Sequence, residues 1–152
     1  MTKKLITFLL IALFVASSAT ANTPKSSGKY KNWESFVLMT EKGKICFAQT
    51  KPVKRAPSAI KRNESRIFVT FRPGDGVSNE ISITNGYPFS KKSNVNVNVG
   101  NAQFKFETKG KFAWMTGLDD ELRMIRAMKK ANKAQVIGKS SRGNKTKDTY
   151  SL

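Results

Sequence analysis

The chain lacks histidine altogether, holds a single cysteine, and has only 10 aspartates and glutamates in 152 residues. Serine, cysteine and zinc hydrolases usually take a general base or a metal ligand from imidazole, so the missing histidine excludes most hydrolytic chemistry. Metal sites need clustered His, Cys, Asp or Glu side chains, and the sequence contains no such cluster. We therefore predict no catalytic residue, no metal site and no cofactor, in a protein that is not an enzyme.

Long apolar runs are also missing, except near the N-terminus. There, Lys3 and Lys4 precede an apolar stretch at 5–15, and small residues follow up to Ala21. This order is typical of a secretory signal peptide. The apolar stretch, roughly 11 residues, is much shorter than the ~20 that span a bilayer. We predict a signal peptide at 1–21 that is cleaved before Asn22, and export with no transmembrane span left; the alternative is an uncleaved anchor helix.

Positive charge is what the sequence has in excess, with 28 lysines and arginines and a formal net charge of +18. The predicted signal peptide holds two lysines and no acid, so most of this excess belongs to the folded part. Such a surface attracts polyanions with a strength that falls as salt rises. Outside the cytoplasm the expected partners are an acidic protein, an anionic glycan or an anionic lipid surface of the cell envelope, and nucleic acid is not expected.

Short strand patterns separated by turn residues fill most of the chain. After a polar segment at 22–32 that we expect to be flexible, alternating or β-branched stretches predict strands at 33–40, 44–50, 66–72, 80–84, 94–99, 102–107, 112–114 and 134–138. Apolar residues at helical spacing predict one helix from about 119 onward. Basic and polar stretches at 51–62 and 140–147 predict loops, and an extended segment is expected to start at 149–152. The expected fold is one mainly β domain at 33–152, an antiparallel sandwich or barrel-like sheet with a C-terminal α-helix packed on it.

Two groups of basic residues are the candidate contacts for an anionic partner. The first group lies in the predicted loop and consists of Lys51, Lys54, Arg55, Lys61 and Arg62. The second follows the helix at helical spacing and consists of Arg123, Arg126, Lys130 and Lys133. The alternative for the second group is a solvated outer helix face without a partner.

Two other functions are compatible with the same composition. The first is an enzyme that acts on a cell-wall or envelope polymer through carboxylates alone, which requires acids converging in one cleft. The adjacent Asp119 and Asp120 do not suit it, because their position at a helix start fits the helix dipole better. The second rival is a structural or chaperone-like envelope component. The single Cys46 is either a buried thiol or half of a disulfide whose partner lies outside this chain.

Several short strings across the chain carry a family resemblance. They are Trp33, Lys44-Ile45-Cys46-Phe47-Ala48, Lys51-Pro52, Arg62, Val69-Thr70-Phe71-Arg72-Pro73, Asn79-Glu80-Ile81-Ser82, Gly86-Tyr87-Pro88-Phe89, Ala113-Trp114, Ala127-Met128-Lys129-Lys130, Gly138-Lys139-Ser140-Ser141-Arg142-Gly143 and Asp148-Thr149-Tyr150-Ser151-Leu152. In this order they resemble the invasion associated locus B family of exported proteobacterial proteins. None of the strings is diagnostic of a chemical reaction.

The resemblance implies a periplasmic or outer-membrane-associated protein, linked to host-cell invasion in pathogenic members, with no enzymatic activity and no cofactor. Family members continue beyond the match at 148–152 with a Gly-Phe stretch and a late cysteine. The resemblance therefore implies that this chain is truncated at its C-terminus and that the missing cysteine would pair with Cys46.

Overall fold

The structure, a computed structural model, describes residues 22–152, so the predicted signal peptide at 1–21 lies outside the described residues. The strands are β1 (Lys25–Tyr30), β2 (Trp33–Thr40), β3 (Gly43–Thr50), β4 (Lys54–Ala56), β5 (Arg66–Arg72), β6 (Val77–Thr84), β7 (Val95–Val99), β8 (Ala102–Lys109), β9 (Phe112–Trp114), β10 (Lys133–Lys139) and β11 (Lys145–Ser151). The described residues also form a short 3-10 turn, η1 (Pro73–Asp75), and one α-helix, α1 (Leu118–Lys130).

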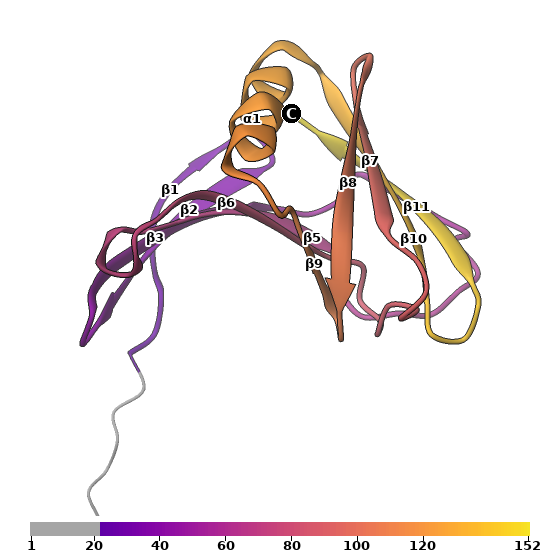
Figure 1. Ribbon diagram of the computed structural model, residues 1–152, viewed down its shortest axis with the longest axis horizontal. Coiled ribbons are helices and arrows are strands. Elements are labelled where there is room, and N and C mark those ends of the chain that lie inside the picture. Colours follow the sequence, from indigo (N-terminus) through magenta and orange to yellow (C-terminus); the bar gives the residue numbers. More distant parts are fainter. Residues whose placement is uncertain (1–21) are drawn as a thin grey trace, which may run out of the picture.

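All the strands belong to one antiparallel sheet, in the order β1-β2-β3-β5-β6-β9-β8-β7-β10-β11-β4. Figure 1 shows this sheet bent back on itself: β1, β2, β3, β5 and β6 form an arched first layer, and β7, β10 and β11 form a second layer. The edge strands β1 and β4 do not pair with each other, so the sheet stays open. This confirms the predicted mainly β fold, a sandwich-like antiparallel sheet with one C-terminal helix.

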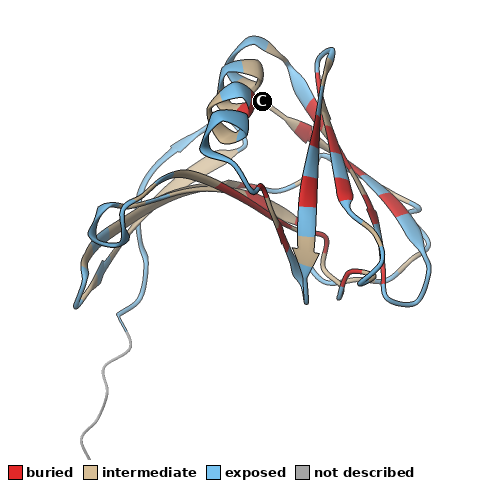
Figure 2. Cartoon of the chain, viewed as in Figure 1, coloured by how far each residue is buried: buried red, intermediate tan, exposed pale blue. Residues whose placement is uncertain are grey.

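The core lies between the two layers and beneath α1 (Figure 2). Ile67, Ile81 and Ile83 fill it from the first layer, while Val95 and Val97 fill it from the second. The valines of β7 are buried and the asparagines between them face outward, as the period-two pattern predicts. Burying one such aliphatic side chain stabilises the fold by about 1.5–3 kcal/mol, so each of these residues contributes to the cohesion between the layers.

Helix α1 covers the open side between the layers by packing one apolar face inward. Met124 is fully buried, and Ile125 and Met128 are half-buried against the core. Three acids in the first turn and two lysines in the last turn match the helix dipole. The predicted helix is confirmed, but it ends at Lys130, so Lys133 is a residue of β10 and not of the helix. None of the helices that the structure describes has the length and hydropathy to cross a bilayer.

Three predicted loops contain strands. Part of the segment expected to be flexible at 22–32 forms β1, which pairs with β2 through its backbone although its side chains are all exposed. Part of the predicted 51–62 loop forms β4, an edge strand, where proline neighbours are tolerated. The predicted loop at 140–147 ends early because β11 begins at Lys145 and pairs with β10. In all three segments the strand forms through backbone pairing with a neighbouring strand, and no alternation of apolar residues in the sequence indicates it.

The hairpin predicted at 33–40 and 44–50 is confirmed as β2 and β3. Cys46 lies in β3, half-buried, with Val37 and Phe71 as its cross-strand neighbours. Its thiol is free in this chain. The disulfide with a residue outside the chain stays a prediction.

Candidate functional site

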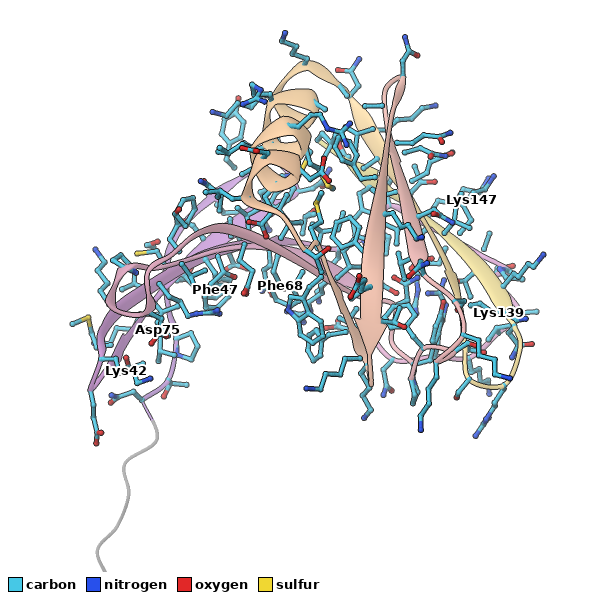
Figure 3. The ribbon with its side chains drawn as sticks, viewed as in Figure 1. Lys42, Phe47, Phe68, Asp75, Lys139 and Lys147 are labelled. Atoms are coloured by element: carbon cyan, nitrogen blue, oxygen red, sulfur yellow. The ribbon has the colours of Figure 1, made fainter. Side chains whose placement is uncertain are left out.

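The outer face of the second layer is rich in lysine. In β10 and β11 buried residues alternate with more exposed ones, so the lysines between the buried positions reach solvent. Strands β4 and β8 flank the same layer and add their outward-facing residues. The lysine face consists of the exposed residues Lys54, Lys105, Lys133, Lys139, Lys145 and Lys147. Figure 3 shows Lys139 and Lys147 projecting away from the core on this side.

The strand register brings these lysines near one another. Lys139 lies directly opposite Lys145 in the β10–β11 pair. Lys105 pairs with Asn96 on β7, and the same row continues across β10 to Lys147. Because adjacent strands are about 4.8 Å apart, the backbones at the two ends of this row are roughly 14 Å apart. Like charges directly opposite each other destabilise a sheet, so stability of the fold does not explain this arrangement.

Amide and hydroxyl side chains occupy the positions between the lysines. One row runs across the layer from Gln103 through Asn98 and Gln135 to Thr149 and Lys54. These groups can both donate and accept hydrogen bonds, whereas a lysine ammonium group can only donate them. The surface therefore combines positive charge with neutral hydrogen-bonding groups.

No lysine of this face lies within ion-pair distance of a carboxylate in residues 22–152. Among the outward-facing residues of the strands that carry the face, Glu107 of β8 is the one acid. The positive charge is therefore largely uncompensated by the protein itself. A surface of this kind attracts anions, and dissolved salt weakens that attraction.

The lysines of the predicted loop group lie in three different places on the protein surface. Lys54 joins the lysine face, whereas Lys61 lies at a pocket described below. Lys51 is ion-paired with Glu64, with 2.5 Å between Nζ and Oε1. Only Lys54 of these three therefore contributes an unpaired charge to the lysine face.

The helix group divides in the same way. Arg123 forms an ion pair with Asp120, with 2.8 Å between Nη2 and Oδ1, and its guanidinium lies 4.3 Å from the ring centre of Phe104. Arg126 and Lys130 are exposed and form no ion pair among the described residues. The predicted stripe thus leaves two available charges on α1, and Lys133 belongs to the lysine face.

The prediction that Arg62 contacts an acidic partner is wrong, because the Arg62 side chain is only 3% exposed. Its Nη1 donates to Asp148 Oδ2 at 2.7 Å, to Asn85 O at 2.9 Å and to Ser65 Oγ at 3.0 Å, and its Nη2 donates to Asp148 Oδ1. The Asp148 side chain is fully buried. Burial, with the Asp148 carboxylate nearby as a smaller cause, raises the pKa of the Tyr150 phenol far above its ordinary value. This ion pair is a scaffold element that joins the 60–65 segment to β11.

Arg55 is also part of the scaffold. It lies on β4 opposite Asp148, is partly buried, and donates from Nη2 to Asn63 O at 2.6 Å. It holds the 60–65 segment against the edge of the second layer. An acidic partner would have to compete with this internal contact, so Arg55 is a poor surface contact.

A polar pocket of about 360 Å³ opens where the 60–63 segment, the 86–88 turn and the β10–β11 loop meet. Two glycines make this meeting possible. A Cβ on Gly86 would lie 2.0 Å from Asn63 O, and Gly86 also has a positive φ of 77°. A Cβ on Gly138 would lie 2.9 Å from both Asn85 Nδ2 and Tyr87 Oη. Neither position tolerates a side chain without moving the pocket wall or floor.

Two carboxylates line the same groove next to α1. Glu80 and Glu121 both line a groove of about 590 Å³ that Trp114 also lines. Arg72 holds Glu80 through two hydrogen bonds of 2.9 and 3.1 Å, and Glu121 accepts a 3.2 Å hydrogen bond from Ile81 N. Partial burial, with the nearby Glu80 charge as a smaller cause, raises the pKa of Glu121.

No protein-family model, curated protein or solved structure gives a significant match to this chain. The resemblance to the invasion associated locus B family therefore rests on the residue strings quoted above. Within residues 22–152, Cys, Asp and Glu side chains do not gather in groups of three or more that could hold a metal ion.

Proposed function

We propose that this protein is an exported, non-enzymatic binding protein of the invasion associated locus B type that holds an anionic polysaccharide of the cell envelope on its lysine face. The observation that carries the proposal is the set of six exposed lysines on one layer without carboxylate partners. The charge excess of the whole sequence gives this surface its long-range attraction.

The composition of the lysine face favours a polysaccharide over the other anionic partners. Membrane-surface binding uses an apolar face that enters the lipid boundary, and here Ile137 is the one large apolar residue pointing outward from β10. Binding of single-stranded nucleic acid uses aromatic side chains on which bases stack, and the outward-facing residues of the lysine face include none. Amides such as Asn98 and Gln135 instead match the hydroxyl groups of a sugar polymer.

The proposed location is the periplasm or the outer membrane. The basic, apolar and small-residue order at 1–21 supports export, and the family resemblance supports an envelope protein whose pathogenic relatives are linked to host-cell invasion. N-terminal sequencing of the exported protein tests this step. We expect the mature chain to start at Asn22, and an intact Met1 on protein found only in the cytoplasm would contradict it.

Retention on immobilised polygalacturonate tests the binding proposal. One variant changes four lysines of the face to glutamine, namely Lys133, Lys139, Lys145 and Lys147. The matched control removes the same charge from four exposed lysines of the first layer, namely Lys25, Lys29, Lys31 and Lys44. We expect the first variant to elute at clearly lower salt, because each lost contact lowers the log–log salt slope by roughly 0.7–0.9 at the charge density of nucleic acids. Equal losses in both variants would contradict a specific face.

The second candidate function is a carboxylate-dependent enzyme acting on a cell-wall or envelope polymer. Only the shared groove of Glu80 and Glu121 favours it, since retaining and inverting glycosidases use two carboxyl groups. The raised pKa of Glu121 suits a general acid, but the ion pair with Arg72 keeps Glu80 occupied. Release of reducing ends from polygalacturonate or peptidoglycan that disappears in Glu121→Gln would establish this function and overturn the binding proposal.

A further inference from the structure

The polar pocket differs from the lysine face in shape and in composition. Its basic lining residues are Lys61, Arg62 and Arg142, of which Arg62 is ion-paired with Asp148 while Lys61 and Arg142 are exposed, and no acid lines the pocket. Ile60 and Pro88 add apolar wall, and the pocket volume of about 360 Å³ lies at the small end of ligand sites. These features indicate a site for one small anionic molecule.

The pocket floor holds hydroxyl groups that are hydrogen-bonded to one another and to a buried amide. Tyr87 Oη and Thr146 Oγ1 are 2.6 Å apart, and Asn85 Nδ2 lies 3.3 Å from the first and 3.4 Å from the second. Each hydroxyl can donate one hydrogen bond and can accept others, so the pocket floor offers polar groups to a hydroxylated ligand.

Side chains, and not backbone amides, must meet the negative charge of the ligand. In the β10–β11 loop, Ser141 N donates to Pro88 O at 2.8 Å, Gly143 N donates to Ser140 O at 2.9 Å, and Asn144 N donates to Ser140 Oγ at 3.1 Å. The loop therefore offers no nest of free amides of the kind that binds phosphate groups. Two exposed cationic side chains beside hydroxyl and amide groups suit an anion that also carries hydroxyl groups, such as a hydroxylated carboxylate.

We infer that the polar pocket binds a small hydroxylated carboxylate, a sugar acid such as a hexuronic acid, with Lys61 and Arg142 holding the carboxylate and the Tyr87–Thr146 pair donating to a ring oxygen or hydroxyl. The pocket and the lysine face share no residue. Binding of a free sugar acid therefore stands or falls independently of the proposal that the lysine face holds a polymer.

Calorimetric titration of the mature chain with D-glucuronate at low salt tests the inference, with D-glucose, acetate and inorganic phosphate as comparison ligands. We expect glucuronate to bind and the three others to bind at least about tenfold more weakly, because each lacks the charge, the hydroxyls or the single carboxylate. Lys61→Gln combined with Arg142→Gln should weaken glucuronate binding by about 10- to 100-fold, the range for hydrogen bonds to charged groups.

Two further variants complete the test. Lys139→Gln combined with Lys145→Gln removes the same charge from the lysine face next to the loop, and glucuronate affinity should stay within about twofold. Tyr87→Phe should weaken glucuronate more than acetate, because the lost hydroxyl serves the sugar. Glucuronate binding that is absent, that equals glucose or phosphate binding, or that falls equally in both charge variants would overturn the inference.

Discussion

Arg62 offers the sharpest stability prediction, because sequence reasoning made it a surface contact and the structure makes it a buried one. Arg62→Gln leaves the fully buried Asp148 carboxylate without its cationic partner. Breaking a buried ion pair from one side costs about 3–5 kcal/mol. For a domain of this size each kcal/mol lowers Tm by about 4 °C, so we expect a fall of roughly 12–20 °C.

Urea unfolding and differential scanning calorimetry measure this cost. Arg142→Gln is the matched control, because Arg142 is exposed and forms no ion pair among the described residues; its free energy of unfolding should stay within about 0.5 kcal/mol of wild type. Arg62→Gln combined with Asp148→Asn removes both charges and should be more stable than the sum of the single losses predicts. A loss below about 1 kcal/mol in Arg62→Gln, or strict additivity in the double variant, would refute the reasoning.

Two further predictions concern the pocket wall and the groove beneath α1. Gly86→Ala should destabilise the protein more than Gly143→Ala. Both glycines have a positive φ, but only at Gly86 would a Cβ clash with backbone, namely with Asn63 O. Equal losses of Tm in thermal melts would show that the close approach of Gly86 to Asn63 does not matter for stability. The raised pKa of Glu121 means that the folded state favours the protonated carboxyl group. The stability that this group contributes is therefore present below its ordinary pKa of 4.5 and is lost as the pH rises through its higher pKa in the folded state. Glu121→Gln should therefore gain stability relative to wild type between pH 4 and pH 7, since the amide oxygen can still accept from Ile81 N; a difference in Tm that stays constant with pH would contradict this.

Local patterns predicted those elements whose side chains alternate clearly between core and solvent. The valines and asparagines at 94–99 and the apolar spacing of α1 are examples, and both elements are confirmed. The first half of β11 was missed because its buried positions Thr146 and Asp148 are polar, whereas its end overlaps the extended segment predicted at 149–152. The ion pair that buries Asp148 joins residues 86 positions apart, and no local pattern reports such a contact.

The candidate site shows the same limit. Sequence reasoning grouped basic residues by their nearness along the chain or by helical spacing, which found Lys54 and Lys133 but assigned them to different groups. The lysine face unites residues of β4, β8, β10 and β11, and only the sheet order brings these strands together. Knowing the charge excess was sufficient to predict a cationic surface, whereas its location required the topology.

Lysine protection by the bound polymer tests the central proposal most directly. The mature chain is acetylated with and without polygalacturonate at low salt, and modification of each lysine is quantified by mass spectrometry. We predict strong protection of the lysine face, at Lys54, Lys105, Lys133, Lys139, Lys145 and Lys147, with unchanged reactivity at Lys25, Lys29 and Lys44 of the first layer. Uniform protection of all lysines, or protection confined to the first layer or to α1, would contradict the proposal.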